Sequence, residues 1–92
     1  MSARIRVLVT GAGGPAGVAA IRSLQRRDDV EVLAADMDGW ASGLYLVDAD
    51  ARRLVPAGAS DAFVPALAAL IAADRIDVVA LTVDAELRAV RG

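Results

Sequence analysis

Short apolar runs alternate with amphipathic runs along this 92-residue chain. Residues 4–10, RIRVLVT, contain a continuous apolar run of the kind found in a strand that is covered on both faces. Residues 16–27 place apolar side chains at helical spacing and arginines on the other side, which predicts an amphipathic helix. Residues 30–35, VEVLAA, predict a second strand that ends at Asp36. The first third of the chain is therefore a strand, a turn, a helix and a strand.

The rest of the chain continues this alternation less regularly. Residues 37–50 contain two glycine turn signals and predict a short helix or a packed loop. Residues 52–55 predict a short third strand, which the following proline stops. Residues 77–83, DVVALTV, predict a fourth strand, and residues 84–90 are long enough to begin another helix.

A helix is also expected between the third and fourth strands, running to about Ala73. Ser60 is a suitable N-cap residue, with Asp61 in the first turn. Pro65 conflicts with a start at Asp61, because proline lacks the N–H that the helix would use there. The helix therefore begins near Phe63 or has a distorted first turn. The apolar residues expected to face inward are Leu67, Leu70 and Ile71.

This order of elements predicts an α/β fold. Strand and helix alternation of this kind gives a small open parallel sheet of about four strands, Rossmann-like, with helices on both faces. The length allows one domain, residues 1–92, with no linker or internal repeat. A fourth strand followed by the start of a helix is an unusual place to stop, so we expect the N-terminal piece of a longer protein. A domain this small is also expected to pack on a further domain or on a second copy.

Composition excludes several kinds of site. The chain has no His, no Cys and no Lys, and all ten of its basic residues are Arg. Ser-His-Asp and Cys-His nucleophiles, Schiff-base lysines, His or Cys zinc sites and the P-loop lysine are therefore absent from it. The net charge of -2 disfavours nucleic acid as a partner. No apolar run approaches the roughly 20 residues of a membrane span, and we expect a cytoplasmic protein with no metal site.

The glycine loop TGAGGPAG follows the first strand and opens the first helix. It fits two spacings, one through Gly11, Gly13 and Gly17 and one through Gly11, Gly14 and Gly17. Glycine allows a tight turn and a close approach of backbone N–H groups to an anionic ligand. Asp36 ends the second strand, where a dinucleotide-binding unit places its ribose-binding acid. The alternative is that the glycines serve the turn alone and that Asp36 is a turn residue.

The segment TVDAEL follows the fourth strand. Thr82, Asp84 and Glu86 lie at the carboxyl end of that strand, the edge where open α/β sheets bind ligands. The alternative is structural, with Asp84 capping the next helix and Glu86 in its first turn. Trp40 and Tyr45 are suited to lining a pocket, but packing in the core or at an interface is the favoured interpretation.

Taken together, RVLVTGAGGPAGVAAIRSL, VLAADMD and LTVDAEL resemble the N-terminal, pre-ATP-grasp domain of ATP-grasp ligases. The group that this order of motifs resembles most is that of the carbamoyl-phosphate synthase large subunit. The resemblance runs over essentially the whole chain, and it depends on the glycine loop and VDAEL together. One local departure is Leu81, which stands where relatives often have proline before the threonine.

The resemblance implies a domain that helps form the acceptor-substrate pocket of a ligase. Such enzymes activate a carboxylate as an acyl phosphate, which an amine or a related nucleophile then attacks. By position, the loop facing the substrate cleft would comprise Gly11, Gly13, Gly14 and Gly17, with Thr82, Asp84 and Glu86 at the neighbouring strand end. ATP and Mg²⁺ would bind to later domains of the polypeptide. No catalytic residue is carried over, so we expect this chain to be inactive alone.

Two other functions remain open. One is an NAD(P)-binding domain that resembles the start of an atypical short-chain dehydrogenase or epimerase, with Gly11, Gly14, Gly17 and Asp36 at the cofactor. The catalytic Tyr-x-x-x-Lys of that family has no counterpart in a chain without lysine. The other is a non-catalytic domain that only packs against a partner.

Overall fold

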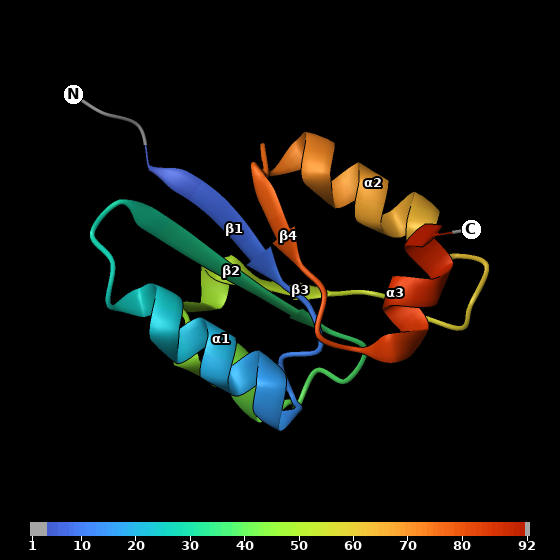
Figure 1. The fold of residues 1–92 in the computed structure, drawn as a ribbon, viewed down its shortest axis with the longest axis horizontal. Coiled ribbons are helices and arrows are strands. Elements are labelled where there is room, and N and C mark those ends of the chain that lie inside the picture. The colour runs from blue at the N-terminus through green and yellow to red at the C-terminus, as the bar shows by residue number, and fades with distance from the viewer. Residues whose placement is uncertain (1–3, 92) are drawn as a thin grey trace.

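The computed structural model describes residues 4–91 and places four parallel strands in one open sheet (Figure 1). In chain order the elements are β1 (Ile5–Val9), α1 (Pro15–Gln25), β2 (Val30–Asp36), η1 (Ser42–Leu46), η2 (Ala49–Ala51), β3 (Arg52–Leu54), α2 (Phe63–Ala73), β4 (Val78–Ala80) and α3 (Asp84–Arg91). The elements η1 and η2 are short 3-10 helices, so the irregular segment is helical over part of its length. The expected Rossmann-like α/β fold is confirmed.

The strand order is β3-β2-β1-β4. The chain steps outward from β1 through β2 to β3 and then crosses back to place β4 on the other side of β1. The register pairs Val7 of β1 with Val32 of β2 and with Val78 of β4. The direction of winding therefore reverses between β1 and β4, and such a switch point leaves a crevice outside the carboxyl ends of the two strands.

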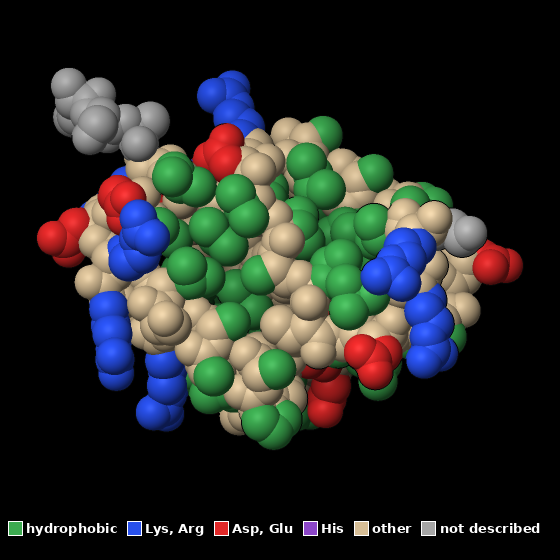
Figure 2. Space-filling view, in the orientation of Figure 1, with side chains coloured by type: hydrophobic (Ala, Val, Ile, Leu, Met, Phe, Trp, Pro, Cys, Tyr) green, Lys and Arg blue, Asp and Glu red, His purple; other side chains and the backbone are tan. Residues whose placement is uncertain are grey.

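Each face of the sheet has its own apolar core, because alternate side chains of a strand point to opposite faces. On one face α1 and η1 cover a cluster that includes Val7, Val9 and Ile21. On the other face α2 lies over a cluster that includes Leu8, Leu33 and Phe63. Helices therefore cover both faces, as expected. The α1 face remains open near β4, where Ile5 and Val78 are exposed, and Figure 2 shows hydrophobic side chains gathered over the middle of this face.

Two predicted helix or strand ends differ from the structure by two residues or more. The first helix was expected to run to Arg27 but ends at Gln25, because the N–H groups of Arg26 and Arg27 bond to carbonyls three residues back and tighten the last turn. The fourth strand was expected over residues 77–83 but spans only Val78–Ala80. Its partner β1 ends at Val9, opposite Ala80, so residues 81–83 leave the sheet.

The second helix begins at Phe63, which is one of the two starts that the sequence left open. Pro65 is then the third helical residue, where no intrahelical partner is needed for an N–H. The predicted cap is wrong: the N-cap residue is Ala62, and the Ser60 hydroxyl oxygen accepts the Ala62 N–H at 3.1 Å in the turn before the helix. Ile71 was expected to face inward but is 36% exposed, whereas Leu67 is buried.

Candidate functional site

Four connecting segments meet at the carboxyl edge of the sheet. They are the glycine loop after β1, the segment from β2 to η1, the loop from β3 to α2 and the short link from β4 to α3. The glycine loop and the β4 link lie side by side, because the Thr10 N–H donates to the Ala80 carbonyl at 3.0 Å (Figure 1). The two motifs that the sequence singled out are therefore neighbours at the switch point of the sheet.

Two hydrogen bonds, one buried and one partly buried, join these two motifs. The Thr82 hydroxyl donates to the Thr10 carbonyl at 2.7 Å, and the Thr10 hydroxyl donates to Oε1 of Glu86 at 2.6 Å. Thr10 is fully buried and Glu86 is only 4% exposed, so water does not compete with the second bond. Thr82 and Glu86 thus fix the glycine loop against the start of α3.

The loop needs glycine at particular positions. Gly11 has φ of +63°, in the left-handed region, and a Cβ there would lie 2.6 Å from Cγ2 of Val83. A Cβ at Gly17 would overlap the Gly11 carbonyl oxygen and lie 2.8 Å from its carbon. At Gly13 it would lie 3.0 Å from the Ala41 Cβ, whereas at Gly14 the nearest atom is 3.6 Å away. The spacing through Gly11, Gly13 and Gly17 is therefore the one whose glycines have the least space for a side chain.

Asp36 closes the loop from the end of β2. Its Oδ2 accepts the Gly13 N–H at 2.8 Å, and its Oδ1 accepts the Asp38 N–H at 3.0 Å. A glycine loop that binds phosphate offers such N–H groups to the ligand. Here the carboxylate of Asp36 already occupies the Gly13 N–H, and its charge opposes an anion at the same place.

A small cavity of about 90 Å³ lies between the four segments. Gly11, Asp36, Gly58, Val83 and Glu86 line it, so every strand end contributes to its wall. Burial raises the pKa of the Glu86 carboxyl above its usual range, the Thr10 hydroxyl lowers that pKa, and the Asp36 charge raises it. The cavity is therefore acidic, with two carboxyl groups close enough to influence each other.

Some expected residues do not join this cluster. Asp84 is exposed, and no side-chain hydrogen bond involves it within residues 4–91. It is the first residue of α3 rather than the cap before it. Trp40 is 85% exposed, so of the expected packing in the core or at an interface the core alternative is wrong and the interface alternative stays a prediction. Tyr45 is also exposed; its hydroxyl donates to the Gly39 carbonyl at 3.1 Å, and Arg52 lies over its ring.

Two residues of the site were missed by the sequence interpretation. Thr10 carries the hydroxyl that binds Glu86, although the sequence interpretation gave it no site role beyond the end of the strand and the start of the glycine loop. Gly58 packs against the start of α3, where a Cβ would lie 2.6 Å from the Glu86 nitrogen. Its position in the loop after β3 was a usable signal, because all carboxyl ends of a parallel sheet meet at one edge.

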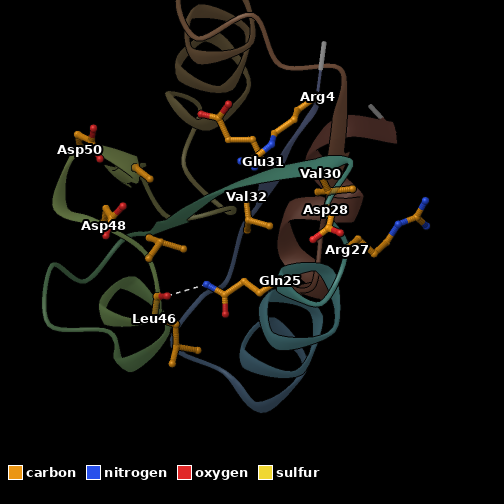
Figure 3. Close-up of a pocket in the computed structure, with 12 residues that line it drawn as sticks. Arg4, Gln25, Arg27, Asp28, Val30, Glu31, Val32, Leu46, Asp48 and Asp50 are labelled. Atoms are coloured by element: carbon orange, nitrogen blue, oxygen red, sulfur yellow. Dashed lines mark hydrogen bonds between the residues drawn. The ribbon is translucent and has the colours of Figure 1, made fainter. Parts of the chain in front are cut away.

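A second hollow lies elsewhere, beside the amino end of β2. It is an open groove of about 580 Å³ between the end of α1 and the segment that holds η1 and η2 (Figure 3). Gln25 spans it by donating to the Leu46 carbonyl at 2.6 Å, and Arg4, Arg27, Asp48 and Asp50 place charges of both signs around it. It contains neither sequence motif and lies away from the carboxyl edge, so we place the candidate site at the small cavity.

The described residues offer no metal centre. Within residues 4–91, no group of three or more His, Cys, Asp or Glu side chains is arranged to hold a metal ion. No helix in the same range combines the length and the apolar character that crossing a membrane requires.

Comparison with known proteins adds no family assignment. No protein-family model matches this chain, and no curated protein matches it.

Proposed function

We propose that this chain is the N-terminal domain of an ATP-grasp ligase similar to the carbamoyl-phosphate synthase large subunit. In this proposal the carboxyl edge of the sheet is one wall of the acceptor-substrate cleft. The observation that carries it is the contact between the two motifs of the resemblance. TGAGGPAG and TVDAEL are held together through Thr10, Thr82 and Glu86, so they act as one structural unit.

The charges at this edge favour a substrate wall over a nucleotide site. Residues 10–14, 37–41, 55–62 and 81–83 connect the strands to the next helices, and none of them is Lys or Arg. Phosphate groups are usually held by such side chains together with free N–H groups. The residues present do not fit MgATP, so the proposal assigns ATP and Mg²⁺ to other domains of a longer polypeptide and no chemical step to this chain.

The open part of the α1 face is consistent with such neighbours. Val78 of the edge strand β4 is 50% exposed, and Ile5, which lies on the neighbouring strand β1 two residues before the partner of Val78, is 42% exposed. Exposed apolar surface at a sheet edge is usually covered in a complete protein. Within the proposal, later domains of the same polypeptide cover this surface.

An NAD(P)-binding domain remains the alternative, and Asp36 is the residue that separates the two. It ends β2, as a ribose-binding acid does, but its two oxygens accept the Gly13 and Asp38 N–H groups. Binding of a pyrophosphate at the loop would have to displace the first of these bonds. The hydrogen bonds of Asp36 therefore favour the ligase interpretation.

Titration calorimetry of the chain with MgATP and with NAD tests the proposal. We expect neither nucleotide to bind with micromolar affinity, because no basic side chain and no free Gly13 N–H meets the phosphates. Micromolar ATP binding would contradict the assignment of ATP to other domains. Micromolar NAD binding that weakens in Asp36→Ala but not in Asp28→Ala would establish the dinucleotide alternative, since Asp28 is an exposed acid at the amino edge.

A further inference from the structure

The most exposed large apolar side chain within residues 4–91 is that of Trp40, in the segment between β2 and η1. Trp40 is 85% exposed and is the only tryptophan of the chain. Leu54, at the end of β3, is 66% exposed and lies nearby, because a Cβ on Gly39 would be 3.7 Å from Cδ2 of Leu54. An exposed indole next to an exposed leucine is typical of a contact surface between proteins.

An open pocket of about 160 Å³ lies beside this indole, at the edge of the sheet that β3 forms. Its wall contains Gly39, Leu44 and Leu54 together with the two arginines of β3. A cavity of about 150 Å³ holds a benzene ring, so the pocket has room for most of an indole. Trp40 of the same chain does not fill it, since that side chain is exposed. We call Trp40 and this pocket the β3 surface.

The pocket carries a positive charge from Arg52, which is partly buried. This guanidinium donates to the carbonyls of Leu44 at 2.7 Å and Val47 at 3.3 Å, and it lies 4.5 Å from the centroid of the Tyr45 ring. None of the ion pairs in the described part of the chain includes Arg52. Indole is the aromatic ring that attracts a guanidinium most strongly, so the charge of the pocket favours a tryptophan as its occupant.

The charges of two such surfaces are complementary. Asp38 is held next to the indole, because its Oδ1 accepts the Trp40 N–H at 2.9 Å. Insertion of Trp40 into the pocket of a second copy therefore brings the Asp38 carboxylate to the rim of the pocket that holds Arg52. Because the indole and the pocket belong to one surface, a two-fold axis between the copies makes both insertions at once.

The area of the β3 surface is near what a specific dimer needs. Four exposed apolar side chains lie on it or beside it in the same segments: Met37, Trp40, Tyr45 and Leu54. From their exposed fractions, burying these four side chains on both copies removes roughly 1,000 Å² from water. Specific protein interfaces begin at about that size, so we expect a weak dimer that dissociates on dilution.

We propose that two copies of this chain associate through the β3 surface, each inserting Trp40 into the pocket of the other. The indole then contacts Leu54 and the guanidinium of Arg52. The inference goes beyond the proposed function and does not depend on it, because β3 and β4 are opposite edges of the sheet and the later domains are assigned to the β4 side. Either proposal can fail without the other.

The single tryptophan makes this association directly measurable. The test is analytical ultracentrifugation of the chain from low micromolar to near-millimolar concentration, with the emission of Trp40 and its quenching by acrylamide recorded over the same range. We expect a monomer–dimer equilibrium. As the dimer forms, the emission maximum should move to shorter wavelength and quenching should fall, because the indole leaves water. Both readouts should share one midpoint.

Two variants of the surface and one matched control locate the contact. Trp40→Ala should weaken the dimer about tenfold or more, because the central side chain of the interface is lost. Leu54→Thr, which alters the pocket and keeps the tryptophan, should weaken it severalfold and move the emission change to higher concentration. Val78→Thr makes the same kind of change at the opposite edge and should leave the dimer unchanged. All three side chains are exposed, so we expect the variants to fold.

Three results would contradict the proposal. A chain that sediments as a monomer at every concentration, with unchanged emission, does not self-associate. If the pocket of Trp40→Ala then binds N-acetyl-tryptophanamide, with NMR shifts at Gly39 and Leu54, its occupant is an aromatic side chain of a different protein. A dimer that Val78→Thr weakens and Trp40→Ala does not weaken forms at the β4 edge instead. Shielded emission from a monomer shows that Trp40 fills the pocket of its own chain.

Discussion

At the residue scale, the glycines of the loop differ in whether the surrounding atoms leave space for a side chain. Gly11 and Gly17 are enclosed by backbone and side-chain atoms, whereas Gly14 has space for a methyl group. The sequence offered both loop spacings equally, because the letters do not reveal where the next strand passes. Only the positions of Ala41 and Asp36, which lie close to Gly13 but not to Gly14, distinguish them.

Replacing Gly17 by alanine should destabilise the fold by about 2 kcal/mol or more, because the added Cβ overlaps the Gly11 carbonyl and the backbone must shift. The matched control is Gly14→Ala, at an N-cap position with extended backbone, which should change the free energy of unfolding by less than about 1 kcal/mol. Thermal and urea denaturation of both variants measure this. Equal stability of the two variants would show that the loop is not packed as described.

The buried carboxyl of Glu86 should make stability depend on pH. Its pKa is raised in the folded chain, so its contribution to stability is fully present below the usual glutamate pKa of about 4.3 and is lost as pH rises through the raised value. Relative to Glu86→Gln, the unaltered chain should lose up to about 1.4 kcal/mol per pH unit across that window. Urea denaturation of both proteins from pH 4 to pH 8 measures the difference. A constant difference would contradict the burial of this carboxyl.

At the element scale, an ion pair links β3 to the end of α2. Arg53 donates two hydrogen bonds to the Asp74 carboxylate, at 2.8 and 3.0 Å, and both side chains are mostly buried. The guanidinium holds the pKa of Asp74 below its usual range. This pair anchors the three-residue strand β3, which has only β2 as a partner in the described sheet.

Asp74→Asn should therefore destabilise the fold by about 1 kcal/mol at neutral pH, because a bidentate pair with little solvent access is lost. Since the pKa of Asp74 is lowered, the stabilisation is present above its usual value and is lost as pH falls through the lowered one. The control is Asp29→Asn, which breaks the exposed pair with Arg27 and should have no measurable effect. Chemical denaturation at pH 7 and at low pH compares the variants, and a larger loss in Asp29→Asn would refute the account.

The elements themselves were largely predictable from the sequence. The period of apolar residues indicated four strands and the two long helices, and the start of α2 at Phe63 is one of the two alternatives that Pro65 left open. Boundaries that depend on a neighbour were not predictable. The early end of β4 is set by where β1 stops, and the exposure of Ile71 depends on how α2 lies over the sheet.

At the scale of the whole molecule, the parallel topology brings distant motifs together. The family resemblance implied that Thr82 would lie at the strand end next to the glycine loop, and Gly11 and Thr82 are neighbours in the structure. It could not predict that Thr10 would bind Glu86, or that Asp36 would close the loop, because both depend on side-chain directions. The small cavity lined by Asp36 and Glu86 results from both contacts.

The central claim is that this chain is the first domain of an ATP-dependent ligase, and the coding sequence that follows the Gly92 codon tests it most directly. The account predicts an open frame that encodes a lysine-bearing nucleotide-binding region and, further on, a pair of acidic or amide side chains for Mg²⁺. A stop codon directly after Gly92, or a continuation carrying Tyr-x-x-x-Lys, would contradict it.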